Sequence, residues 1–253
     1  MPDWLVPWII VAVVIWPLVK VEEWVHLRIQ GLGLLITDNP QAATLIYYIV
    51  LLPGVVLHEL SQWVLAQLLR VKVERFQLWP DKQGKRIRLG LVEIDKKTDD
   101  LRATLVGMVP LVSGVTALVL IGRARFDVHT LFAGLGTGDL PTAMAAIRTF
   151  TSAPDFWIWV YLAFTIANAM LPEEHDRVNW WLFIVPMAGI AAALLLLDLG
   201  ILLEAWLDGP LTAIGEWLSF GLALALGIDL FVMALLAITE EIVGRIKDRI
   251  TEY

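Results

Sequence analysis

The sequence has no cysteine and few charged residues. Without cysteine there is no disulfide and no thiolate metal site, so any metal ligand must be histidine, carboxylate or amide. Only 18% of the 253 residues are charged, whereas a soluble globular domain has about one quarter. The net charge of -7 and the lack of a basic stripe exclude nucleic acid as a partner.

Apolar residues dominate instead. They make up 58% of the chain, the mean hydropathy is +0.71, and there are 12 tryptophans, a residue that concentrates at membrane interfaces. The composition predicts an integral membrane protein in a lipid bilayer, with the plasma (inner) membrane as the expected location.

Six segments come close to the roughly 20 apolar residues that span a bilayer. We therefore predict an all-α polytopic membrane protein with about six transmembrane helices, over residues 4–18, 42–69, 101–121, 156–171, 181–203 and 214–238. The first lacks a basic start and a cleavage site, which favours a retained helix over a signal peptide. Pro53 and Gly54 interrupt the second and predict a kink or a division there.

Basic residues predict the orientation. Ten of the 19 lysines and arginines lie within residues 70–102, and short cytoplasmic loops are enriched in such residues. With six spans, this loop, both termini and the basic C-terminal tail would be cytoplasmic.

The same loop carries a β-hairpin signal. Apolar residues alternate before and after a turn-like stretch at 80–85, at Val71, Val73, Phe76 and Leu78, and at Ile87, Leu89 and Leu91. We predict a single membrane domain over residues 1–253. Within it lie a cytoplasmic hairpin at 70–100 between the second and third spans, the third and fourth spans at 101–180, and C-terminal helices with a basic tail at 181–253.

An ionisable pair, His58 and Glu59, lies inside the second apolar helix. A charge at the bilayer centre costs at least about 2.5 kcal/mol, so such residues usually face a cavity, a metal or a partner. In a His-Glu-x-x-His helix, residues i and i+4 grip one zinc ion, and the glutamate activates its water. Here residue i+4 is Gln62.

A second motif follows the fourth span, where Asn168 precedes Pro172, and Asp176 comes eight residues after Asn168. Together with the His-Glu helix and the hairpin after it, this pattern resembles the site-2 protease family of intramembrane zinc metallopeptidases. The resemblance covers about residues 50–180. In that family a helix with His-Glu-x-x-His precedes a β-rich segment, and a later helix unwinds at an Asn-x-x-Pro stretch whose aspartate is the third zinc ligand.

The resemblance implies roles for individual residues. His58 and Asp176 would bind Zn²⁺, Glu59 would be the catalytic general base, and Asn168 with Pro172 would hold an unwound transmembrane protein substrate. Gln62 stands where the second histidine belongs, and an amide is a poorer zinc ligand than imidazole. His175 is an alternative ligand. The implied reaction is hydrolysis of a peptide bond in or near a transmembrane segment.

Two other functions stay open. Gln62 favours a catalytically inactive homologue that binds transmembrane partners without cutting them. Acidic residues in or near apolar helices, namely Glu59, Asp198 and Asp229, are also consistent with a small proton or cation transporter.

Overall fold

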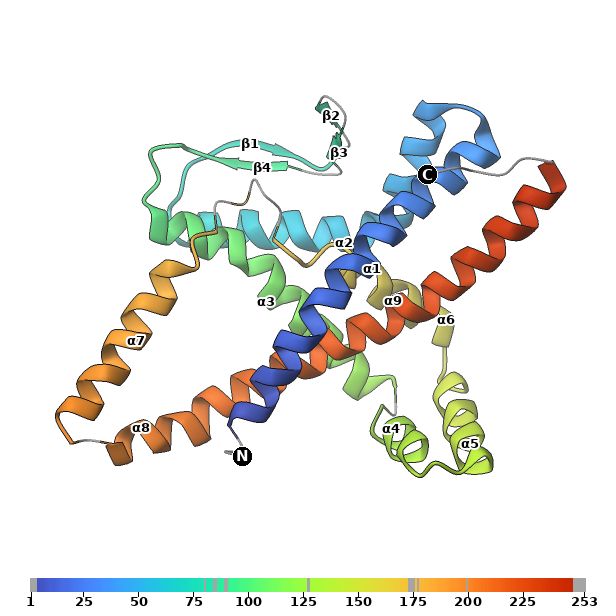
Figure 1. Ribbon diagram of the computed structural model, residues 1–253. Coiled ribbons are helices and arrows are strands. Elements are labelled where there is room, and N and C mark those ends of the chain that lie inside the picture. Colours follow the sequence, from blue (N-terminus) through green and yellow to red (C-terminus); the bar gives the residue numbers. More distant parts are fainter. Residues whose placement is uncertain are drawn as a thin grey trace.

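The computed structural model describes residues 4–79, 81–83, 86–88, 91–126, 128–172, 176, 178–198 and 200–247. The fold is largely helical, with a small sheet between the second and third helices (Figure 1). This confirms the expected all-α architecture with a β insertion.

Two long helices begin the described chain, α1 (Leu5–Thr37) and α2 (Pro40–Leu68). They are joined at Asp38, whose φ of 52° turns the backbone. The Asn39 side chain then accepts hydrogen bonds from the backbone N–H groups of Gln41 and Ala42, and Pro40 occupies the first turn of α2, where its missing N–H is tolerated. The helix α1 is far longer than the 4–18 segment that apolarity indicated, and α2 continues through Pro53.

The insertion after α2 forms two antiparallel pairs. The strand β1 (Val73–Gln77) pairs with β4 (Leu91–Ile94), and the short β2 (Asp81–Gln83) pairs with β3 (Arg86–Arg88). The register between β1 and β4 shifts once, between Val73 and Arg75. The β1–β4 pair contacts α2 and lies along it (Figure 1). The predicted hairpin is therefore present, while its cytoplasmic side stays a prediction.

The chain returns through α3 (Asp100–Ala124), which leads away from the sheet to a pair of short helices, α4 (Val128–Gly136) and α5 (Leu140–Thr151). The Asp139 side chain caps α5, and hydrogen bonds from the hydroxyl and backbone N–H of Thr142 hold the pKa of this carboxyl below its usual value. The helix α6 (Phe156–Ala167) then re-enters the bundle. It ends four residues before the limit predicted for the fourth span.

The predicted fifth span, 181–203, is divided in the structure. The helix α7 (Trp181–Leu196) ends before Asp198, which has a φ of 56°, and α8 (Gly200–Trp206) follows. A left-handed residue stops a helix because its carbonyl and N–H leave the helical ladder. A π-helical turn (Leu207–Leu211) then leads into α9 (Thr212–Lys247), which contains the predicted sixth span.

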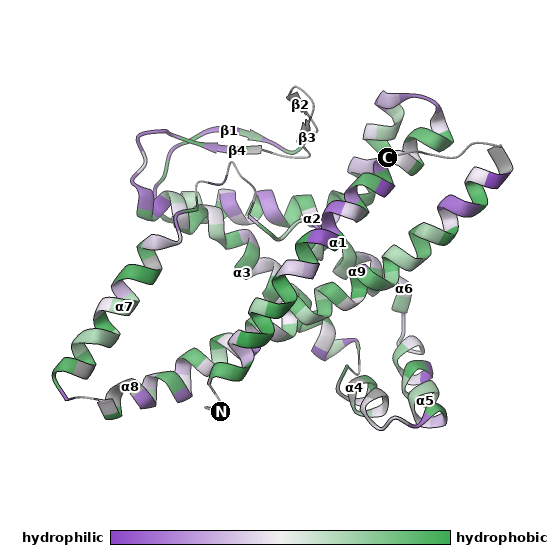
Figure 2. Cartoon of the chain, in the orientation of Figure 1, coloured by the Kyte–Doolittle hydropathy of each residue, from purple (hydrophilic) through white to green (hydrophobic). Residues whose placement is uncertain are grey.

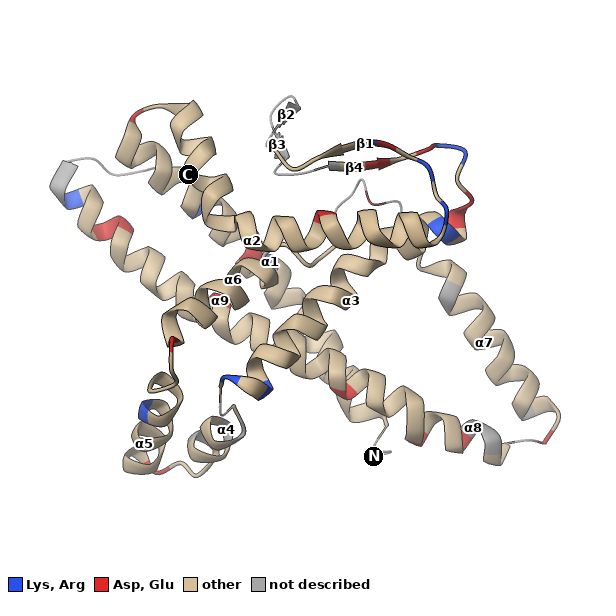
Figure 3. Ribbon diagram, turned by 180° about the vertical axis from the view of Figure 1, so that it is seen from behind, with Lys and Arg blue, Asp and Glu red and all other residues tan. Residues whose placement is uncertain are grey.

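Among the described residues, four helical segments are long and apolar enough to cross a membrane. They are α1, α2, α3 and the stretch over residues 204–245, which runs from the end of α8 through the π-helical turn into α9. Two shorter apolar helices lie at Phe156–Ala167 and Ile184–Leu194. Hydrophobic residues cover most helical surfaces (Figure 2), and charged residues gather near the sheet and the helix ends (Figure 3). The chain is thus an integral membrane protein by its helices, and the count of six spans stays a prediction.

The core lies where α1, α2, α3, α6 and α9 cross. The most extensive contact joins α1 to α9, and α2 packs on both α3 and α6. Buried residues from all five helices form one cluster, including Leu18, Leu51, Leu118, Ala163 and Leu222. By contrast α7 stands away from these helices (Figure 1).

Candidate functional site

Three residues that the sequence singled out meet inside this core. His58 and Gln62 are one turn apart on α2, and Asp176 lies in the segment between α6 and α7. His58 Nε2 is 3.9 Å from Asp176 Oδ2, and Gln62 Nε2 donates to Asp176 Oδ1 at 2.7 Å. All three are at most 7% exposed. The structure thus joins residues 114 positions apart into one buried polar cluster.

The orientation of His58 is fixed by the backbone of the segment after α6. Its Nδ1 lies 2.5 Å from the carbonyl oxygen of Ala169. A carbonyl can only accept a hydrogen bond, so Nδ1 is the donor, and in the neutral ring Nε2 carries the lone pair. That lone pair points at Gln62 and Asp176. Metal-binding histidines are oriented in the same way.

Gln62 connects the other two residues through one atom. Its Nε2 is 3.2 Å from His58 Nε2 in addition to the bond with Asp176. A side-chain amide nitrogen has two hydrogens and no lone pair to offer, whereas the carboxylate and the neutral His58 Nε2 are both acceptors. The Gln62 nitrogen therefore satisfies two buried acceptors at once.

Small residues allow α6 to approach α2, and the segment after α6 to approach α3. A Cβ at Gly54 would overlap the carbonyl of Thr165, and one at Gly114 would overlap the Met170 side chain. Since glycine has no side chain, backbones pack closely at such points. The helix α6 ends at Ala167, so the unwinding expected near Asn168 is present.

Asp176 itself rests on α3. A Cβ at Gly107 would overlap the Asp176 carbonyl oxygen and would lie 2.9 Å from the Val178 side chain. Nearby, the buried Thr104 hydroxyl accepts a hydrogen bond of 3.2 Å from the Asn179 backbone N–H. Sequence reasoning missed both positioning residues. A glycine within an apolar span was the available signal for Gly107, but it does not tell which backbone approaches.

A second buried pair adjoins the cluster. The Asn168 amide donates to Asp229 Oδ1 at 2.6 Å and to the Phe164 carbonyl at 3.0 Å, and Asp229 on α9 is fully buried. Among the described residues, Asn168 Oδ1 and Asp229 Oδ2 have no hydrogen-bond partner. The resemblance assigned Asn168 to substrate binding, but in this structure its amide nitrogen donates to groups within the helix bundle. The sequence indicated Asp229 only as an acid of the transporter alternative, and its bond to Asn168 was not expected.

The remaining predicted residues have different positions. Glu59 is buried, at 5% exposure, and Pro172 is half-buried in the segment after α6. His175 lies outside the described residues. Asp198 is exposed in the break between α7 and α8, whereas Asp229 is buried among the crossing helices.

The donor set fits a zinc ion only in part. In a tetrahedral site, two ligand atoms at about 2.0–2.1 Å from the ion lie about 3.4 Å apart. The His58 Nε2–Asp176 Oδ2 distance is 3.9 Å, so the two side chains would have to move closer together to share a zinc ion. Catalytic zinc sites normally have three protein ligands. Gln62 presents its nitrogen in the third place, and no group of three His, Asp or Glu side chains with metal-binding geometry occurs among the described residues. As placed, these side chains do not complete a catalytic zinc site.

Comparisons of the chain with protein-family models, with curated proteins and with solved structures returned no match. The resemblance to site-2 proteases therefore depends on the residue pattern alone. The cluster of His58, Gln62 and Asp176 adds a spatial observation to that pattern.

Proposed function

We propose that this chain is a membrane protein related to the site-2 proteases that binds a transmembrane segment of another protein without cutting it. The motif order supports the relationship, because a His-Glu helix, a small sheet and an unwound segment with Asp176 follow one another. The convergence of His58 and Asp176 supports it further.

The observation that carries the proposal is the position of the Gln62 amide nitrogen. It lies 2.7 Å from Asp176 Oδ1 and 3.2 Å from His58 Nε2. Its two N–H groups can therefore donate to the two acceptors that a metal would otherwise bridge. A buried acceptor that already has a donor gains less from a cation than one without a donor. The three side chains thus form a hydrogen-bonded unit without a metal.

An apolar cavity provides a place for a few side chains of a partner helix. It measures about 290 Å³ and is lined by side chains from α1, α2, α6 and α9, including Ile36, Val50, Tyr161 and Leu236. It lies beside the core near Phe164, the residue whose carbonyl bonds to Asn168. Apolar side chains of a transmembrane segment match this lining, because helices in membranes associate through close packing.

Cross-linking tests the binding claim. Because the chain has no cysteine, Val50→Cys gives a unique attachment point in the cavity for a benzophenone maleimide. The matched control is Leu120→Cys on α3, which is 62% exposed on an outer surface. We expect an uncleaved single-span protein to be cross-linked at residue 50 and not at residue 120. Equal yields at both positions, or a cleaved product, would contradict the proposal.

A second candidate, a small proton or cation transporter, is favoured only by the complete burial of Asp229. A transmembrane acid is a functional candidate by default. The test is proton flux into proteoliposomes. Flux that is abolished by Asp229→Asn and unchanged by His58→Ala would favour the transporter over the first proposal.

A further inference from the structure

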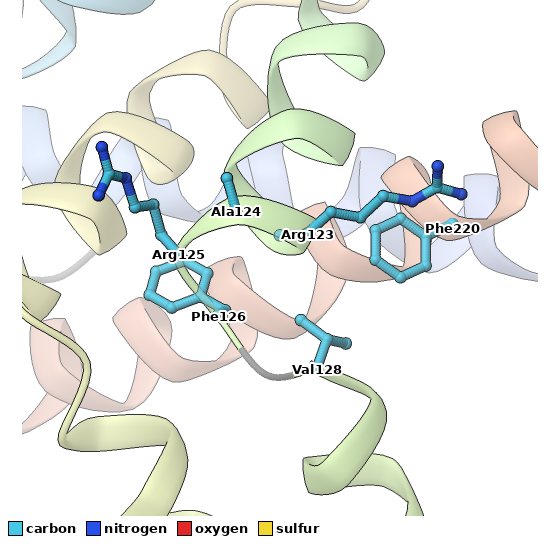
Figure 4. A pocket seen from close by; sticks show the side chains of 7 residues that line it. Arg123, Ala124, Arg125, Phe126, Val128 and Phe220 are labelled. Carbon is cyan, nitrogen blue, oxygen red and sulfur yellow. The ribbon is translucent and has the colours of Figure 1, made fainter.

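A pocket at the far end of α3 combines two arginines with apolar walls. It measures about 500 Å³ and is lined by Gly122, Arg123, Ala124, Arg125, Phe126, Val128 and Phe220 (Figure 4). It lies at the end of a membrane-spanning helix, on the opposite side from the sheet (Figure 1). In a membrane such a helix end is at the level of the lipid headgroups.

The two arginines that line the pocket lie against aromatic rings. The Arg123 Cζ atom is 5.9 Å from the centroid of the Phe220 ring, and the Arg125 Cζ atom is 4.6 Å from the centroid of the Trp159 ring. Within the described residues neither forms an ion pair, although Asp155 and Glu216 lie one helical turn from these rings. Stacking holds a guanidinium in place and leaves its N–H groups available to an anion.

The geometry limits what kind of anion fits. The guanidinium groups of Arg123 and Arg125 point to opposite sides of the pocket (Figure 4), so they flank it and do not clamp one small ion. The carbonyls at the end of α3 add a partial negative charge of about half a unit, which two full positive charges exceed. A ligand with an anionic headgroup and an apolar body fits such a pocket, because the headgroup can contact an arginine while the apolar body contacts the apolar lining residues.

The neighbouring helix α5 has the surface of a segment that lies in the interface. Leu140, Met144 and Ile147 are 71%, 60% and 46% exposed, and their spacing puts them on one face. On another face the buried Ala146 packs against Gly134 of α4. An exposed apolar stripe beside a pair of cations is typical of helices that rest among lipid headgroups.

We propose that this pocket, independently of the function proposed above, binds the headgroup of an anionic phospholipid. The phosphate meets a stacked guanidinium, the acyl chains follow the apolar surface of the bundle, and α5 inserts its apolar stripe beside them. The same phosphate chemistry occurs in soluble anions, and the test must separate the two sources.

Lipid adducts counted by native mass spectrometry test the proposal. Phosphatidylglycerol and phosphatidylcholine are added in turn to the detergent-purified chain and to the Arg123→Gln/Arg125→Gln double variant. The control, Arg102→Gln/Arg245→Gln, removes the same charge from arginines that already pair with acids. We expect the wild type and control to prefer phosphatidylglycerol, and the double variant to lose that preference by on the order of 10-fold.

Three results would overturn the proposal. They are equal binding of both lipids by the wild type, equal loss of preference in the control, and displacement of phosphatidylglycerol by millimolar inorganic phosphate, which would indicate a soluble-anion site.

A fluorophore attached at Met144→Cys provides a second measurement. In nanodiscs this fluorophore should be in an apolar environment, whereas one attached at Thr149→Cys should be in water. Equal polarity at the two positions would contradict the interfacial placement of α5.

Discussion

The Gln62 side chain donates a hydrogen bond of 2.7 Å to Asp176, a residue 114 positions later in the chain. This bond ties α2 to the irregular segment between α6 and α7. Because Gln62 and Asp176 are 3% and 7% exposed, water does not readily replace either partner. Loss of the amide should therefore leave a buried acceptor without this donor.

We expect Gln62→Ala to destabilise the protein by about 1–3 kcal/mol, the cost of an unsatisfied buried polar group. The matched control is Gln67→Ala, which removes an exposed glutamine from the same helix and should change stability by less than about 0.5 kcal/mol. Thermal unfolding in detergent measures both. Equal midpoints for the two variants would show that the Gln62 bond contributes nothing to stability.

The close approach of α3 to Asp176 gives a second prediction. Gly107→Ala places a methyl group on the Asp176 carbonyl, so the segment must move and the variant should lose at least about 1 kcal/mol of stability. Gly227→Ala on α9 meets nothing within 4 Å and should be neutral or stabilising by up to about 1 kcal/mol, because alanine favours a helix. If Gly107→Ala also proves neutral, the described contact is wrong.

The Asn168–Asp229 pair predicts energetic coupling between α6 and α9. Asn168→Ala leaves the fully buried Asp229 without its donor, and adding Asp229→Leu removes the stranded acid. We expect a coupling energy of about 0.5–3 kcal/mol from the double-mutant cycle. The control cycle pairs Asn168→Ala with Asp198→Leu, an exposed position, and should be additive. Additivity in the first cycle would show that Asn168 and Asp229 are not energetically coupled.

The architecture was largely predictable, because apolar runs and alternating residues are local signals. They indicated membrane helices and the β insertion between α2 and α3. Helix ends were less predictable. The helix α1 continues past Lys20 and Glu23, which pair with each other at 2.8 Å, and the fifth segment breaks at a left-handed Asp198. Apolarity encodes neither a helix that continues through charged residues nor a left-handed break.

The residues of the site were predictable from the sequence, but the hydrogen bonds between them were not. The resemblance to site-2 proteases implied that His58, Gln62 and Asp176 belong together, and the structure brings them close to one another. The part played by Asp229, and the glycines on which the segment rests, depend on which helices cross at which point. That information is tertiary, so a single sequence gives no direct signal for it.

Zinc content tests the central claim, that the Gln62 amide takes the place of the metal between His58 and Asp176. The wild type, Gln62→His and Gln62→His/Asp176→Ala are purified in the presence of zinc and measured by atomic emission. We expect little zinc in the wild type, close to one ion per chain in Gln62→His because three good ligands then meet, and loss of that ion in the double variant. Stoichiometric zinc in the wild type that Asp176→Ala alone abolishes would contradict the account and point to a working metallopeptidase site.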